Sequence, residues 1–182
     1  MYGSIGKILE WFIGLFFAIF VPILLVGVKS DQIIQSNAQE VVEDFVTRSA
    51  ATGQIDQASY MEFISKLDAT GTAYDVTFDH KHLVYEPAID SSGSAAVNNY
   101  DSGFTSYYYS TGTDEILYTI YNSGSEDRPY YMSYGDWFCV TAVNKTPTLG
   151  SRMLTLIHLP GEDNKIVARY PAFVSRVNEK VN

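Results

Sequence analysis

Two histidines separated by one residue are the side chains in this chain best suited to chemistry. In a strand, His80 and His82 would point to the same face, and imidazole nitrogens are common ligands of Zn²⁺. A third ligand would have to come from His158, Asp79 or Asp75. No fixed spacing connects the pair to any of these residues, and the same local sequence is typical of a solvent-exposed strand end. We therefore expect no metal site and no cofactor.

The single cysteine, Cys139, is the other candidate for chemistry. A cysteine with a histidine base is the machinery of cysteine transpeptidases, but their Thr-Leu-x-Thr-Cys motif is absent from the sequence. The sequence also lacks a Gly-x-Ser-x-Gly elbow, a phosphate-binding glycine loop and a His-Glu-x-x-His motif. Within the apolar string at residues 137–140, Cys139 is expected to be a small buried core residue. We therefore expect that the protein is not an enzyme.

Tyrosines give the chain its most distinctive surface chemistry. They gather in the second half of the sequence, at Tyr107, Tyr108, Tyr109, Tyr118, Tyr121, Tyr130, Tyr131 and Tyr134. Because side chains alternate along a strand, Tyr107 and Tyr109 share a face that Tyr108 does not. We expect one set to lie in the core and the other to be exposed. Tyr107, Tyr109 and Tyr131 are the candidate surface contacts, either for subunit packing or for a ligand such as a glycan.

The charge of the chain argues against one class of partner. Its 182 residues include 21 Asp and Glu against 12 Lys and Arg, for a formal net charge of −9. Almost all of the carboxylates lie after residue 30, so residues 31–182 are strongly acidic. An acidic surface repels phosphate backbones, and we therefore expect no nucleic-acid partner.

An uncharged run at residues 11–28 predicts a membrane-spanning helix. At about 1.5 Å per residue, a run of this length covers about 27 Å, close to the roughly 30 Å hydrocarbon layer of a bilayer. The run is longer than the apolar part of a signal peptide, and it has no good cleavage site, so we expect an uncleaved anchor. Glu10, at its start, reaches the lipid headgroups or pairs with a positive group on a neighbouring subunit. Pro22 is expected to kink the helix.

After this run the pattern changes to that of an amphipathic helix within residues 31–50. Apolar residues recur at three- and four-residue steps, at Ile34, Ala38, Val41, Val42 and Phe45. We expect one continuous helix over about residues 5–50, ended by Gly53. A second helix is expected to begin after the N-cap Asp56 and to end near Gly71.

The remainder of the chain predicts an antiparallel sheet. Residues 74–85 alternate between apolar and polar side chains and are followed by Pro87, which indicates a strand. Residues 88–103 have the Ser, Gly and Asn content of a surface loop. We expect three hairpins, made of residues 104–109 with 115–121, residues 130–134 with 137–143, and residues 152–159 with 165–177. The amphipathic helices are expected to cover the apolar face of this sheet.

The predicted fold class is therefore α+β, with two parts. Residues 1–30 form the N-terminal membrane anchor, and residues 31–182 form one extracytoplasmic domain, with helices over about 31–70 and the sheet over about 74–177. About 150 residues are enough for one domain with its own core. We expect the N-terminus on the cytoplasmic side, because the acidic, tyrosine-rich remainder is typical of extracellular modules.

Several short motifs accompany this plan: Gly53-Gln-Ile55, Tyr60, Phe63, Leu67, Thr70-Gly71, Tyr74-Asp-Val76, His80 and Gly135-Asp136. Together with the apolar helix, its acid and its proline, they resemble type IV pilins and pseudopilins. The more specific similarity is to pilin-like membrane proteins of Gram-positive bacteria that are associated with tight-adherence (Tad-type) pilus or secretion loci. One spacing differs, because three residues separate Gly6 from Glu10 where Tad prepilins have four.

The resemblance implies a pilin-like structural or assembly subunit at the cell surface. Its partners would be membrane lipid and other pilin-like subunits, packed through the N-terminal helix, with Glu10, Trp11 and Pro22 as the assembly residues. In that family, the acid pairs with the N-terminus of a neighbouring subunit. The alternative is a membrane-tethered extracellular binding module, in which the span is a plain anchor and exposed tyrosines recognise a ligand.

Overall fold

The computed structural model describes residues 2–87, 104–122, 128–156 and 165–175 of the chain. The helices are α1 (Tyr2–Thr52), α2 (Gln57–Asp68), α3 (Thr113–Asn122) and α4 (Leu149–Leu156). The strands are β1 (Gln54–Ile55), β2 (Tyr74–Pro87), β3 (Phe104–Gly112), β4 (Tyr130–Tyr131), β5 (Trp137–Asn144) and β6 (Val167–Phe173). The fold is α+β, with a long apolar N-terminal helix and antiparallel sheets, as the sequence predicts.

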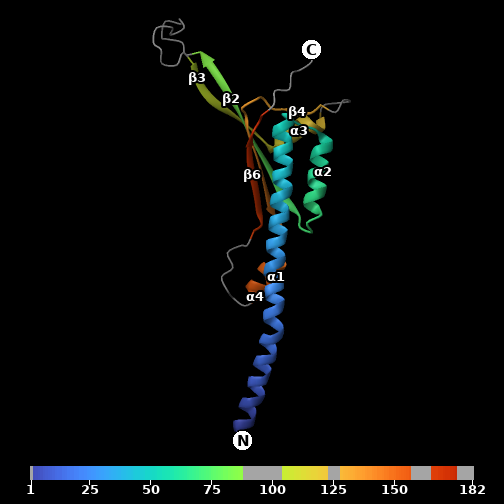
Figure 1. Cartoon of the computed structure of the whole chain (residues 1–182), viewed down its shortest axis with the longest axis vertical. Helices are drawn as coiled ribbons and strands as arrows, with labels where there is room; N and C mark the ends of the chain where they lie inside the picture. The colour runs from blue at the N-terminus through green and yellow to red at the C-terminus, as the bar shows by residue number, and fades with distance from the viewer. Residues whose placement is uncertain (1, 88–103, 123–127, 157–164, 176–182) are drawn as a thin grey trace.

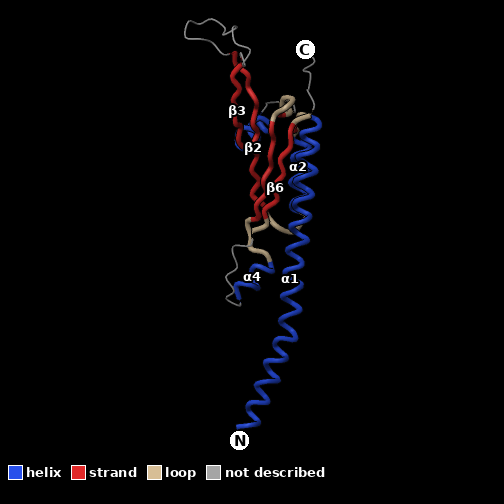
Figure 2. Tube along the Cα trace, turned by 60° about the vertical axis from the view of Figure 1, so that its left-hand side comes forward, coloured by secondary structure: helices blue, strands red, loops and turns tan. Residues whose placement is uncertain are grey.

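Helix α1 forms the spine of the molecule (Figure 1). It is continuous over 51 residues, which confirms the predicted single rod. Pro22 lies inside α1 without ending it, and Figure 2 shows the N-terminal half inclined to the half that lies beside the sheet. The helix ends where Gly53 adopts a φ of 68° and its N–H donates to the carbonyl of Ser49 at 2.8 Å. Glycine adopts this left-handed conformation without the steric penalty of a Cβ.

Helix α2 begins and ends at the residues that the sequence indicates. The carboxylate of its N-cap, Asp56, accepts from the Ser59 N–H at 2.6 Å, and the Ser59 hydroxyl lies 3.3 Å from the Asp56 N–H, which completes a capping box. The chain leaves the helix through Gly71, with a φ of 83°. α2 then packs against α1 through Phe63 and Phe45, whose rings stack with centroids 4.3 Å apart.

The main sheet is antiparallel, with the strand order β3-β2-β5-β6. Its register places Phe78 opposite Val140, and Val140 opposite Tyr170. Helices α1 and α2 lie on one face of this sheet, and Figure 2 shows them as a layer beside the strands. The buried core lies between the two layers and includes Val42, Phe45, Val46, Ile55, Phe63, Leu67, Phe78, Ile116, Phe138, Val140 and Ala168. The helices therefore cover the apolar face of the sheet, as expected.

The first predicted hairpin is wrong in its second half, because residues 113–122 form α3 instead of a strand. Two acidic residues, Asp114 and Glu115, occupy the first turn, where they favour a helix through its dipole. Ile116 and Ile120, four residues apart, are both buried, which is the spacing of a helix face. The tyrosines in this segment give it the alternating pattern of a strand. In the structure, however, Tyr118 and Tyr121 are exposed on the helix.

The other two predicted hairpins also need correction. Within residues 130–134 only β4 is a strand, and it pairs with β1 rather than with β5. Residues 149–156 form α4 instead of a strand, because the Thr148 hydroxyl accepts from the Ser151 N–H at 3.2 Å and caps a helix. Strand β6 exists, and it pairs with β5. The predicted loop at residues 88–103, together with His158, lies outside the described residues.

Candidate functional site

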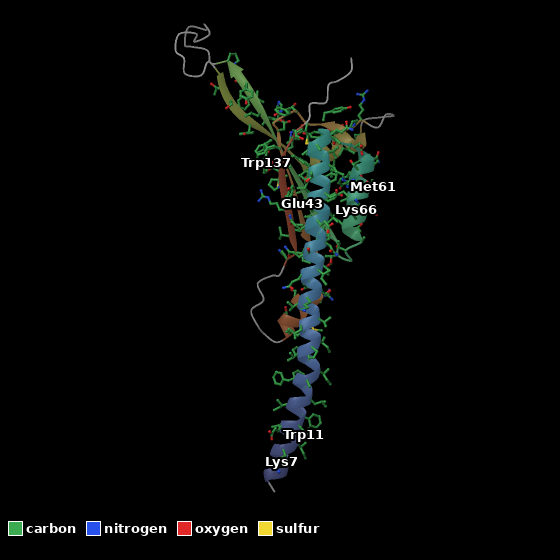
Figure 3. The ribbon with its side chains drawn as sticks, viewed as in Figure 1. Lys7, Trp11, Glu43, Met61, Lys66 and Trp137 are labelled. Carbon is green, nitrogen blue, oxygen red and sulfur yellow. The ribbon has the colours of Figure 1, made fainter. Side chains whose placement is uncertain are left out.

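The N-terminal half of α1 presents an apolar surface that no other described element covers. Its large side chains are exposed: Ile8, Leu9, Trp11, Phe12, Ile13, Leu15, Phe16, Phe17, Ile19, Val21, Ile23, Leu25 and Val26. The most exposed of these residues is Trp11, at 81%. Figure 3 shows Lys7 and Trp11 on this projecting part of the helix. Contiguous apolar surface on this scale marks a site of contact with a membrane or another protein.

This surface belongs to the one helix, among the described residues, that is long and apolar enough to cross a membrane. Within its most apolar window only 6% of the residues are buried in the structure. A helix in the core of a soluble domain is mostly buried, so α1 differs from that class here. Its length and composition fit a membrane-spanning helix, and they also fit a signal sequence.

The three predicted assembly residues all lie on this part of α1. Glu10 and Trp11 line a groove of about 680 Å³ together with Lys7, Gly14, Leu15 and Ala18. Lys7 and Glu10 are three residues apart, but among the described residues neither forms an ion pair. Pro22 lies further along the same helix. Glu10 and Trp11, which are neighbours in the chain, therefore lie next to two small residues, Gly14 and Ala18, that allow close approach of another helix.

The two histidines converge on Asp136, a residue that their spacing in the sequence does not indicate as a partner. One carboxylate oxygen of Asp136 lies 2.9 Å from Nε2 of His80, and the other lies 2.7 Å from Nδ1 of His82. Because an ionised carboxylate can only accept, each histidine donates from the nitrogen that faces it. Asp136 is 1% exposed and His80 is 4% exposed. Tyr130 completes the cluster, with its hydroxyl oxygen 2.7 Å from Nδ1 of His80.

The turn before β5 holds Asp136 in place. Gly135 adopts a φ of 84°, and the Ser133 N–H donates to Oδ2 of Asp136 at 2.7 Å. The Val174 N–H donates to the Asp136 carbonyl at 2.8 Å, which ties the turn to the end of β6. Burial is the main reason why the pKa of Tyr130 is raised above its usual value, and the nearby charges of Glu115 and Asp136 raise it further.

The hydrogen bonds of this cluster connect β2, β4 and the turn before β5. They occupy both oxygens of Asp136 and both ring nitrogens of His80. Among the described residues, no group of three His, Cys, Asp or Glu side chains is arranged to hold a metal ion. The arrangement therefore joins the strands internally through the buried His80 and Asp136, while the His82 side chain is 40% exposed.

The predicted surface tyrosines are exposed, but one expectation about them is wrong. Tyr107, Tyr108 and Tyr109 are each about half exposed, so neither alternating set lies in the core. They lie on β3, which is an edge strand and pairs with the outer half of β2. The Tyr107 hydroxyl donates to Oε1 of Glu86 at 3.0 Å. Tyr131 is also exposed, on β4.

Cys139 is buried, as the sequence predicts. Its sulfur accepts a contact at 3.3 Å from Nε of Arg169 on β6. Within the described part of the chain, the hydrogen bonds of His80 and His82 go to Asp136 and Tyr130, so the nucleophile and base arrangement considered above is not assembled there. No protein-family model, curated protein or solved structure matches the chain.

Proposed function

We propose that this protein is a non-enzymatic, single-pass membrane subunit of the pilin-like kind. Its N-terminal helix packs against the helices of other subunits, in the membrane or in a surface filament, and its α+β domain faces outward. The observation that carries this proposal is the exposed apolar half of α1, which continues without a break into the helix that covers the sheet. A helix that serves only as a membrane anchor does not need to continue into the domain, because a flexible linker could connect the two.

Glu10 supports assembly over simple anchoring. A carboxylate beside an apolar span is costly unless it reaches the headgroups or meets a positive partner. Glu10 forms no ion pair with any described residue of its own chain, and it lies in a groove with small residues. In the proposed assembly, a positive group of an adjacent subunit meets this carboxylate.

Cysteine crosslinking in cells tests the proposal. Cys139 is first replaced by alanine, and single cysteines are then placed along residues 12–28 of the full chain. We expect crosslinked dimers with maxima every three to four positions, because one face of the helix makes the contact. Tyr118→Cys, exposed on α3, is the matched control and should give much less dimer. Monomer at every position from 12 to 28 would reject the proposal.

The exposed tyrosines favour a second candidate function, a membrane-tethered binding module. Three consecutive exposed tyrosines on an edge strand offer aromatic surface for a ligand such as a glycan. This function predicts that an unrelated apolar helix can replace the first 30 residues without loss of activity at the cell surface. If that replacement abolishes function while the domain stays folded and on the surface, the binding-module interpretation fails.

A further inference from the structure

Helix α4 lies at the end of the domain that is nearest to the apolar run of α1. Glu10 and Lys29 are the charged residues on either side of this run. At about 1.5 Å per residue, the helix between them covers about 28 Å, close to the roughly 30 Å hydrocarbon layer of a bilayer. Figures 1 and 2 both show α4 beside α1, between the sheet and the projecting N-terminal part. A bilayer that surrounds the apolar run therefore has its headgroups at the height of α4.

Two contacts fix the depth of α4 along α1. The Thr148 hydroxyl, just before α4, donates to Oδ2 of Asp31 at 2.5 Å, and both residues are buried. Two residues later, Gly150 lies so close to α1 that an added Cβ would be 3.1 Å from the Gly27 carbonyl oxygen. The contact points on α1 thus move four residues, or about 6 Å, towards the apolar run as the chain enters α4. Helix α4 therefore leads away from the sheet and towards the membrane-spanning part of α1.

The sequence of α4 suits the boundary between lipid and water. It contains three leucines and a methionine but only one charged residue, Arg152, which is exposed. Leu149, Met153 and Leu156 are four and three residues apart, so the helix places them on one side, roughly a quarter turn round from Gly150. The apolar side of α4 is therefore distinct from the side that docks on α1. Helices of this kind lie in the membrane interface, with apolar residues towards the acyl chains and basic residues among the phosphates.

Arg152 gives this end of the molecule a positive charge that its own chain does not neutralise. Its side chain forms no ion pair with any residue in the described part of the chain. The whole chain carries a formal net charge of −9, so most of its surface is repelled by anionic headgroups, whereas a cation at the membrane boundary attracts lipid phosphate. Because α1 already holds α4 beside the bilayer, the contact of α4 with lipid is effectively intramolecular, and a small contact area is sufficient.

We propose that α4 lies in the headgroup layer of the bilayer and that the Arg152 guanidinium group binds lipid phosphate there. This inference rests on the membrane-spanning part of the proposed function, and it adds a second point of contact with the membrane. A domain held only by α1 can tilt freely with that helix. A domain held by both α1 and α4 has its tilt relative to the membrane surface restricted.

Fluorescence quenching of the full chain in vesicles of phosphatidylcholine and phosphatidylglycerol tests the depth of α4. Cys139→Ala is combined with Thr155→Cys, an exposed position on α4, and the new cysteine carries an environment-sensitive fluorophore. A lipid with a spin label on its headgroup should quench this fluorophore at least about threefold more strongly than the same fluorophore at Tyr118→Cys. Tyr118 is exposed on α3, at the other end of the domain (Figure 1). A third variant, Phe16→Cys in the apolar run, reports whether α1 itself lies in the bilayer.

Charge variants test the contact with phosphate. In the same vesicles, Arg152→Glu should reduce quenching of the fluorophore at position 155 at least about twofold, whereas Arg152→Lys should retain most of it. If the fluorophore at position 16 lies in the bilayer but the one at position 155 is quenched no more than the one at position 118, this inference is overturned and the proposed function stands. Equal quenching in Arg152→Glu and the unmodified α4 also overturns it. If the fluorophore at position 16 is in water as well, both proposals are rejected.

Discussion

Nε2 of His80 lies 2.9 Å from Oδ2 of Asp136, although 56 positions separate the two residues in the chain. Both side chains are buried, and they join the centre of β2 to the turn that precedes β5. A buried hydrogen bond to a charged group contributes about 1.5–3 kcal/mol. This pair is therefore expected to be one of the strongest single polar contributions to the stability of the domain.

Replacement of Asp136 by asparagine tests that expectation. The amide has nearly the same size but carries no charge, and one of its two positions is a donor that would face a histidine N–H. We expect the free energy of unfolding to fall by about 1.5–3 kcal/mol. Denaturant unfolding of the full chain in detergent micelles measures it, with Asp68→Asn at the exposed end of α2 as the control. Equal unfolding midpoints for the two variants would contradict the structural role of Asp136.

The raised pKa of Tyr130 predicts a loss of stability at alkaline pH. Because burial favours the protonated phenol, the contribution of Tyr130 is fully present below its ordinary pKa of 10.0 and is lost as the pH rises through the raised value. Tyr130→Phe should therefore lower stability at neutral pH, since it removes the contact with His80, and should reduce the fall in stability above about pH 10. Thermal unfolding between pH 8 and pH 11 measures both effects.

The matched control for Tyr130 is its neighbour Tyr131, which is exposed on the same strand. Tyr131→Phe removes a hydroxyl of the same type without disturbing the cluster, so we expect a pH dependence close to that of the unmodified chain. A pH profile for Tyr130→Phe that parallels the unmodified chain throughout would show that Tyr130 does not control the alkaline transition.

Because the rings of Phe45 and Phe63 stack in the core, truncation of either side chain is expected to lower the free energy of unfolding substantially. Phe63 lies on α2 and is fully buried in the core, with its ring stacked on Phe45 of α1. Phe63→Ala removes that burial and leaves a cavity, which should lower the free energy of unfolding by about 3–5 kcal/mol. Met61→Ala, two residues away on the exposed side of α2, should cost well under half as much. Calorimetric or denaturant unfolding of both variants checks the difference.

Gly150 is packed so closely against α1 that even one added methyl group would be too large. A Cβ at this position would overlap the Asp31 carboxylate and lie 3.1 Å from the Gly27 carbonyl oxygen. Gly150→Ala should therefore displace α4 from α1, at a cost of about 1–3 kcal/mol. Gly112→Ala is the control, because a Cβ added there would have no neighbouring atom within 4 Å. Faster proteolysis near α4 in Gly150→Ala, but not in Gly112→Ala, is the expected readout.

The elements that the sequence predicts well are those with long or locally complete signals. The continuous α1 follows from the apolar run and the amphipathic spacing after it, and α2 follows from Asp56 at one end and Gly71 at the other. Helices α3 and α4 are short, and their ends depend on one or two polar side chains. In α3 the exposed tyrosines obscure the helical spacing of Ile116 and Ile120.

The histidine cluster shows why the polar interior is harder to predict. The sequence places His80 and His82 on one face, which the structure bears out through their shared contact with Asp136. Their partner depends on the pairing of β2 with β5, which sets His80 opposite Phe138 and so brings the preceding turn beside it. Nothing in the local sequence specifies that register. The Gly135-Asp136 pair nevertheless indicates a turn, and this turn signal is the one feature of the local sequence that points to the position of Asp136.

The absence of a joint between the projecting half of α1 and the half that covers the sheet has a mechanical consequence. Any tilt or rotation of the part of α1 that follows Pro22 is transmitted to the domain as a rigid-body movement, because the helix continues from there into the domain without a break. The orientation of the domain therefore reports the orientation of the helix below it. In an array of such subunits, a small change in helix packing would swing the outer end of the β2 and β3 ribbon through a much longer arc (Figure 1).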